Sequence, residues 1–202
     1  MLRFHYHPYS TFARRVHVML LEKDIPHEKL LVDLPARAQR QPGYLAMNPY
    51  GRVPLIEDDG FVLYESAAIM MYLEQTCGGQ PLLPDNARGK ALVDMHLRLC
   101  DLQFATHARN IVFPKRFLPP EKWNLEAIEQ ARLEVEAHLA VVAQTLQGHD
   151  YLVGDRFTLA DIAYLPFLHF LPLMEVTPSP AVEAWSQRLL SRASAQATIP
   201  AR

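Results

Sequence analysis

Hydrophobic positions in the first 77 residues follow two different periods. Short apolar runs rich in β-branched and aromatic residues predict strands, and apolar residues that recur at helical spacing predict helices. The predicted strands are residues 2–6, 27–34, 53–56 and 61–63. Helices are predicted over residues 11–23 and from residue 65 or 66 onward, with a less regular, partly helical passage over 36–47. This order predicts an α/β domain over residues 1–77.

A stretch rich in glycine and proline, residues 78–87, predicts a linker, and beyond it the strand signals cease. Residues 88–202 are therefore predicted to form an all-helical domain. A long helix is expected from Asn86 to about Val112, with a buried stripe of Leu92, Met95, Leu99 and Leu102, and an interruption is expected from Pro114 to Pro120. A second helix is expected over 125–147, ended by Gly148, with an inner face of Ile128, Val135, Leu139, Val142 and Leu146.

The segment around Thr158 predicts a helix start. Thr158 and Asp161 have the spacing of a capping box, and Phe157 and Ile162 have the spacing of a hydrophobic staple. Asp161 is therefore expected to be buried and stabilising rather than catalytic. The residues from Ser191 onward are small and polar and are expected to fray.

Charge and composition exclude several classes of partner. The 202 residues carry 20 basic and 22 acidic side chains, a formal net charge of −2, so neither nucleic acid nor a membrane is an expected partner. Cys77 and Cys100 form no metal-binding or redox motif, and both are expected to be reduced thiols in a cytoplasmic protein. The histidines His5, His7 and His17 do not share one face, so no metal site is expected.

Residues 48–69 combine a loop, a hairpin and a helix start. Val53-Pro54 precedes one strand, Asp59-Gly60 favours a tight turn, and Glu65-Ser66 can cap the next helix. This block resembles the cytosolic glutathione transferases. The resemblance implies a cis Val53–Pro54 bond, with the backbone of Val53 binding the peptide part of glutathione and Glu65-Ser66 holding its γ-glutamyl group. It also implies a thioredoxin-like N-terminal domain followed by the helical C-terminal domain of that family.

The same resemblance assigns the catalytic hydroxyl. The segment Pro8-Tyr9-Ser10 through Arg14-Arg15-Val16 is similar to the Pro-x-Ser-x-x-x-Arg-x-Val pattern of the serine-type branch, which places Ser10 at the catalytic position. From the residues alone, Ser10 or Thr11 is equally a helix cap. Thr11 is the second candidate for the activating hydroxyl, and Tyr6 is the third.

Two arginines and an aromatic group complete the expected site. Arg40 and Arg52 fall where the family contacts glutathione, although a surface role competes for both. Arg14 and Arg15 are expected to serve packing and ion pairs near the domain junction. By the same resemblance, a hydrophobic electrophile would lie against an aromatic, weakly polar wall of the helical domain. The residues expected to form this wall are His107, Asn110, Phe113, Phe117 and Tyr164.

The function implied is that of a homodimeric glutathione transferase, which activates the glutathione thiolate for attack on a hydrophobic electrophile. Glutathione is then a co-substrate, and no metal is needed. Two alternatives stay open. One is a glutathione-dependent dehalogenase, ether-cleaving enzyme or isomerase on the same fold. The other is a non-catalytic binding or regulatory protein, against which the presence of Ser10, Glu65 and Ser66 together argues.

Overall fold

The chain folds into two compact units. The computed structural model describes residues 1–200. One unit comprises Met1–Leu82 together with the described residues from Ala193 onward, and the other is Leu83–Arg192. The division falls within the predicted linker. The last residues, however, belong with the N-terminal unit rather than with the helices that precede them.

The first unit contains a mixed four-stranded sheet. Its strands are β1 (Leu2–Tyr6), β2 (His27–Leu31), β3 (Leu55–Asp58) and β4 (Phe61–Tyr64), in the order β2-β1-β3-β4. Strands β1 and β2 are parallel, whereas β3 runs antiparallel to both β1 and β4. Parallel strands need a crossover connection, and here it is supplied by helix α1 (Thr11–Glu22). This is the thioredoxin-like arrangement that the family resemblance predicts.

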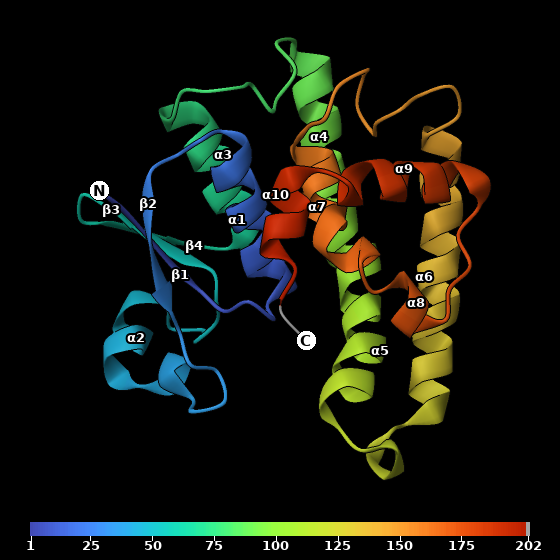
Figure 1. Cartoon of the computed structure of the whole chain (residues 1–202), viewed down its shortest axis with the longest axis horizontal. Helices are drawn as coiled ribbons and strands as arrows, with labels where there is room; N and C mark the ends of the chain where they lie inside the picture. The colour runs from blue at the N-terminus through green and yellow to red at the C-terminus, as the bar shows by residue number, and fades with distance from the viewer. Residues whose placement is uncertain (201–202) are drawn as a thin grey trace. The chain divides into compact units, whose positions relative to one another are not determined.

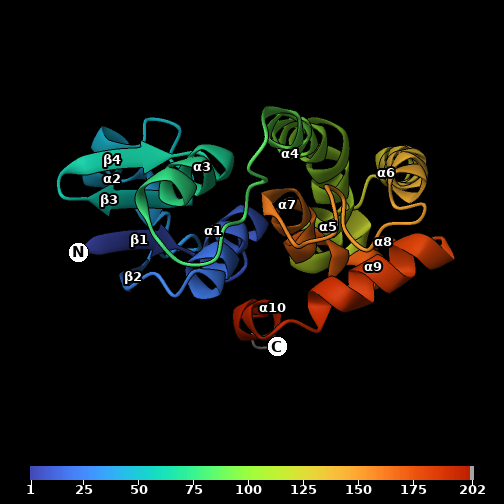
Figure 2. The same cartoon turned by 90° about the horizontal axis from the view of Figure 1, so that it is seen from above.

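Helices cover the sheet and complete its hydrophobic core. Along the chain, the short η1 (Ala38–Arg40) and α2 (Pro42–Met47) connect β2 to β3, and α3 (Ser66–Thr76) follows β4. Helices α1 and α3 pack against each other beside the sheet (Figures 1 and 2). The β3–β4 turn has positive φ angles at Asp59 (46°) and Gly60 (88°), as expected for a two-residue hairpin turn.

The C-terminal segment forms a helix, contrary to the expectation that it frays. Helix α10 (Ala193–Thr198) packs against α1 (Figure 2). Ser194, Ala195 and Thr198 are buried, and the Ser194 hydroxyl donates a hydrogen bond to Glu22 on α1. Small side chains at these positions allow the close approach of the two helices, and that packing holds a segment whose composition alone suggested fraying.

The second unit is entirely helical within its described residues. Its elements are α4 (Ala87–Leu99), the π-helical η2 (Cys100–Ala105), α5 (Thr106–Phe117), η3 (Pro120–Lys122), α6 (Leu125–Thr145), α7 (Leu159–Leu168), α8 (Leu171–Met174) and α9 (Pro180–Leu190). Every residue of α7 is buried, and α7 packs against α4 and α9. The capping box at Thr158 and Asp161 is present, as predicted.

The buried stripe predicted for the first long helix is wrong. Leu92, Met95 and Leu102 are 45%, 43% and 67% exposed. The helix instead buries apolar residues one or two positions further along the chain, namely Val93, Leu97, Cys100 and Phe104. The expected inner face of α6 is correct, since Ile128, Val135, Leu139, Val142 and Leu146 are all buried. Pro114 does not interrupt α5, which continues to Phe117.

Candidate functional site

Sheet topology brings three predicted site segments to one edge. In the register, His5 on β1 pairs with Leu55 on β3, and Leu55 pairs with Tyr64 on β4. Because β3 is antiparallel to its two neighbours, its first residues lie beside the last residues of β1 and β4. The segment leading to Ser10, the Val53–Pro54 turn and the Glu65–Ser66 helix start therefore emerge from the same edge of the sheet.

Ser10 is the N-cap of α1. Its backbone is extended (φ −83°, ψ 112°), and its Oγ accepts a hydrogen bond of 3.2 Å from the Ala13 backbone N–H. Ser10 as a whole is half-buried. A serine hydroxyl that accepts one hydrogen bond still has its own proton to donate. Capping and anion binding are thus compatible roles for the same side chain.

The alternative hydroxyls lie in different surroundings. Thr11 is the first residue of α1. The Tyr6 ring stacks on Phe4, with centroids 5.4 Å apart, and lies 6.0 Å from the His17 ring. These contacts place the Tyr6 ring among side chains of the sheet and α1.

The loop before β3 is held by side chains that the sequence motifs do not identify. The Arg52 carbonyl accepts hydrogen bonds from the Tyr44 hydroxyl and the Asn48 Nδ2, both at 2.8 Å. Tyr44 and Asn48 are buried, and burial raises the pKa of the Tyr44 phenol, so it stays protonated as a donor. The Val53–Pro54 bond that follows is cis, as predicted. The sequence signal for this ordered loop is Asn48 directly before Pro49, because asparagine side chains commonly stabilise turns.

The two predicted arginines are exposed and play different local roles. An Arg40 guanidinium nitrogen donates to the Tyr50 carbonyl over 3.2 Å, so this side chain braces the same loop. Arg52 contributes its carbonyl to the Tyr44 and Asn48 contacts, while its side chain is exposed. Neither arrangement prevents the guanidinium from meeting an anionic ligand.

Helix α3 begins without a side-chain cap. Glu65 occupies the N-cap position with φ +73°, an uncommon angle for a residue other than glycine, and makes no capping hydrogen bond. Backbone conformations of this kind cost about 1–3 kcal/mol and cluster at functional sites. Ser66, the first helical residue, is buried, and its Oγ accepts a hydrogen bond of 3.3 Å from Arg15. Glu65 therefore occupies the expected N-cap position, but its side chain makes no capping hydrogen bond.

An uncapped helix start suits a carboxylate ligand. The first N–H groups of a helix lack partners within the helix, and the helix dipole adds a partial positive charge there. The site edge thus combines two helix starts, at Ser10 and Ser66, with the backbone of an ordered loop. These groups are suited to an extended, anionic ligand.

Of the aromatic side chains expected in the substrate-facing wall, two are exposed on the second unit and one is buried. Phe113 and Phe117 on α5 are 48% and 49% exposed, with ring centroids 5.5 Å apart. His107 is half-buried and Asn110 is exposed on the same helix. Tyr164 is fully buried, and its hydroxyl lies 3.0 Å from His138 Nε2. Its assignment to a substrate-facing wall is therefore wrong, because it belongs to the core of this unit.

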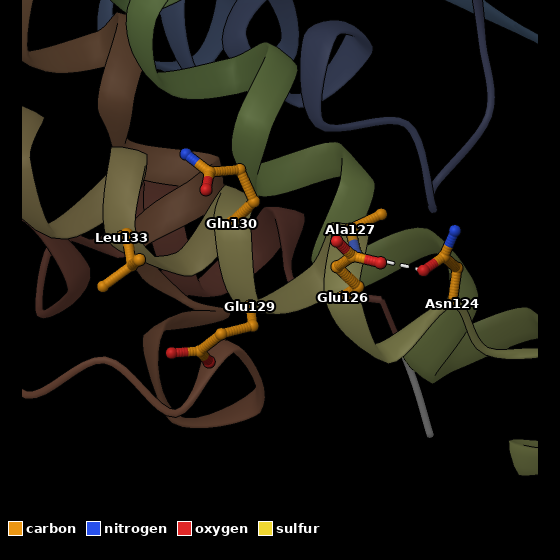
Figure 3. Close-up of a pocket in the computed structure, with 6 residues that line it drawn as sticks. All are labelled: Asn124, Glu126, Ala127, Glu129, Gln130 and Leu133. Carbon is orange, nitrogen blue, oxygen red and sulfur yellow. Dashed lines mark hydrogen bonds between the residues drawn. The ribbon is translucent and has the colours of Figure 1, made fainter.

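A hollow of about 450 Å³ lies elsewhere, on the outer surface of α6 (Figure 3). It is lined by Asn124 and by residues of α6, namely Glu126, Ala127, Glu129, Gln130 and Leu133. None of the predicted site residues lines this hollow. Among residues 1–200, no cluster of three or more potential metal ligands occurs. Over the same part of the chain, no helix has the length and apolarity to cross a membrane.

Comparison with known proteins gives consistent matches. The family model of the glutathione S-transferase N-terminal domain matches residues 9–76, and that of the C-terminal domain matches residues 109–193. Glutathione S-transferase F10 of Arabidopsis thaliana is 32% identical, with 94% of this chain and 92% of the relative covered. GstB of Escherichia coli K12 is 29% identical, with 94% and 93% covered.

A solved structure extends the likeness to three dimensions. Glutathione transferase F2 from Populus trichocarpa superposes with a TM-score of 0.90 at 27% identity, over 98% of this chain and 97% of that one. Both units are thus matched, and so are the segments that carry the site edge. The chain belongs to the glutathione S-transferase family, with a thioredoxin-like N-terminal domain and a helical C-terminal domain.

Proposed function

We propose that this protein is a glutathione transferase in which Ser10 stabilises the glutathione thiolate for attack on a hydrophobic electrophile. The observation that supports the proposal is that the chain segments leading to Ser10, Val53 and Ser66 adjoin strand ends at the same edge of the sheet. In this arrangement the Val53 backbone binds the cysteinyl part of glutathione, and the start of α3 receives the γ-glutamyl carboxylate. Arg40 and Arg52 are suited to bind the other carboxylate of glutathione.

The energy required of Ser10 is modest. A thiol with an ordinary pKa of about 8.5 is about 3% ionised at pH 7, whereas a pKa of about 6.5 makes it roughly three-quarters ionised. That change corresponds to about 2.7 kcal/mol in favour of the anion. A hydrogen bond to a charged acceptor contributes about 1.5–3 kcal/mol and a helix start about 0.3–1 kcal/mol. Ser10 at the start of α1 can therefore supply the shift.

The exposed rings of Phe113 and Phe117 support an apolar second substrate. Aromatic side chains bind flat apolar groups through large contact areas and offset stacking. The sulfur of glutathione is the nucleophile in this mechanism, so the protein has only to position and ionise it.

The decisive experiment compares Ser10→Ala with Thr11→Ala and Tyr6→Phe. Binding of glutathione is followed by calorimetry, thiolate formation by ultraviolet absorbance, and turnover with an activated aryl chloride. We expect Ser10→Ala to bind glutathione but to lower turnover at least about tenfold and raise the pKa of the bound thiol. Unchanged turnover would assign activation to another hydroxyl. Binding without any turnover in the wild type would indicate a binding protein instead.

We also propose that the protein is a homodimer. The exposed Leu92, Met95 and Leu102 form an apolar stripe along one face of α4 and η2, of the kind that marks protein contacts. Sedimentation should give twice the chain mass of 23.0 kDa. The double substitution of Leu92 and Met95 by Glu should give monomers. A wild-type protein that sediments as a monomer would contradict this proposal.

A further inference from the structure

Arg15 is a buried cation that lies behind the start of α3. Its side chain is completely buried, and the guanidinium carbon sits 4.7 Å from the centroid of the Phe12 ring. A guanidinium does not lose its proton inside proteins, so the charge is permanent. Burial of such a charge is unfavourable unless hydrogen bonds and other polar contacts compensate for it. A completely buried arginine therefore calls for a structural or functional reason.

One contact of Arg15 connects the two helices whose starts form the candidate site. Arg15 lies on α1, the helix that begins at Ser10, and its Nη1 donates to the Oγ of Ser66 on α3 over 3.3 Å. Ser66 is 4% exposed, so its rotamer is confined by its surroundings. The contact thus determines how the Ser66 hydroxyl is presented at the helix start.

A hydroxyl group has one proton and two lone pairs. Because Arg15 donates to the oxygen of Ser66, it occupies a lone pair and leaves the Ser66 proton to be donated elsewhere. The nearby positive charge also polarises the O–H bond and adds to the partial positive charge of the helix start. Both effects favour a carboxylate as the acceptor of that proton.

We propose that Arg15 is a positioning residue that acts through Ser66 to select the α-carboxylate of the γ-glutamyl group. This inference rests on the proposed function, since it concerns the same glutathione site. It differs from a packing or ion-pair role for Arg15 because it predicts an effect on one functional group of the ligand. The cysteinyl and glycyl parts of glutathione should not sense Arg15.

The test compares two ligands by calorimetry. One is glutathione and the other is 4-aminobutyryl-cysteinylglycine, which lacks only the α-carboxylate. We expect Arg15→Gln to weaken glutathione binding about tenfold and binding of the analogue less than about twofold. In steady-state assays, KM for glutathione should rise while kcat stays within about threefold of the wild-type value. Arg15→Lys, which keeps the charge, should recover most of the affinity.

The neighbouring Arg14 provides a matched control, because it is also buried on α1. Arg14→Gln should keep the wild-type ratio of the two affinities. Equal weakening of both ligands by Arg15→Gln, or the same selective loss in Arg14→Gln, would overturn the inference.

A double-mutant cycle covers the case in which Arg15→Gln does not fold. The effect of Arg15→Met, which removes the charge but keeps a long side chain, on glutathione affinity should disappear in a Ser66→Ala background, because the two residues act as one unit. Additive effects would contradict the inference while leaving the glutathione site intact. Failure of the wild type to bind glutathione would instead overturn the proposed function, and this inference with it.

Discussion

Asp161 is a buried carboxyl group that accepts hydrogen bonds from four donors. These are the backbone N–H groups of Leu152 and Thr158, the Thr158 hydroxyl and the Trp185 indole, at 2.9–3.2 Å. Burial raises the pKa of Asp161, and the bonds from Trp185 and Thr158 act in the opposite direction. Hydrogen bonds to this one carboxyl group thus connect the start of α7, the preceding loop and α9.

Asp161→Ala should therefore be strongly destabilising. It leaves buried donors without an acceptor, at about 1–3 kcal/mol each, so we expect the free energy of unfolding to fall by at least about 3 kcal/mol. Urea denaturation measures this change. Asp155→Ala, in the same segment but with a side chain 95% exposed, should change stability by less than about 0.5 kcal/mol. Similar losses in the two variants would contradict the assigned role.

His138 introduces a pH dependence into the helical domain. It is 7% exposed and stacks on Tyr164, with ring centroids 5.7 Å apart. Burial, with a smaller effect from His96 and His107, lowers the pKa of His138 from 6.5 to about 4. The unfolded chain takes up this proton at a higher pH than the folded chain does. Stability that is present above pH 6.5 is therefore lost as the pH falls toward about 4.

His138→Gln should flatten this profile. The free energy of unfolding is measured by urea denaturation at several pH values from neutral to acidic. The slope of this free energy against pH should decrease by up to about 1.4 kcal/mol per pH unit. His149→Gln, at a side chain 54% exposed, controls for the removal of a histidine. An unchanged acid slope in His138→Gln would show that other groups cause the acid sensitivity.

At the scale of elements, the loop between α2 and β3 depends on one carbonyl. The Arg52 carbonyl is held by Tyr44 and Asn48, directly before the Val53 backbone that we assign to glutathione. Tyr44→Phe removes one of these two hydrogen bonds without changing the ring. We expect a loss of about 1 kcal/mol in stability and a rise of several-fold in KM for glutathione. Tyr50→Phe, at a side chain 60% exposed, should leave KM unchanged; an equal rise in both variants would contradict the role of Tyr44.

The sequence predicts elements well where local chemistry is decisive. Asp59-Gly60 specifies its turn and Thr158 with Asp161 specifies its helix start, because each motif satisfies a local backbone requirement. The first long helix is different, since two apolar sets that lie one or two positions apart both recur at helical spacing. Leu92, Met95 and Leu102 form one, and Val93, Leu97, Cys100 and Phe104 form the other. Periodicity does not distinguish them, and only tertiary packing decides which is buried.

The candidate site shows the same limit. Ser10, Val53, Pro54, Glu65 and Ser66 are found from motifs, and the register then places their segments at one edge. Tyr44 is not predicted from the sequence, and Arg15 is predicted only for packing and ion pairs, because their hydrogen bonds to Arg52 and Ser66 depend on the fold. Arg15 and Ser66 are 51 positions apart in the sequence. Tyr164 is misassigned because an aromatic residue on an apolar helix has the same pattern in a pocket wall and in a core.

At the scale of the whole molecule, the first unit is built from two separate parts of the chain. Helix α10 returns to α1 after the entire helical domain has been completed. Ala195→Asp, at a side chain with 0% exposure, places a charge in this contact and should lower the unfolding temperature by about 5 °C or more. Ala197→Asp, on the exposed side of the same helix, should have less than half of that effect. Equal shifts would mean that α10 does not stabilise the first unit.

This discontinuity gives the protein a particular order of completion on the ribosome. The sheet, α1 and α3 are synthesised first, yet the surface of α1 that receives α10 stays uncovered until residues 193–198 emerge. The helical domain of Leu83–Arg192 must be translated in between, which takes roughly 5–20 s at common rates of synthesis. The unit begun first is therefore completed only after the helical domain has been made, and a chain released before residue 193 would lack α10 although every residue of the site edge was already present.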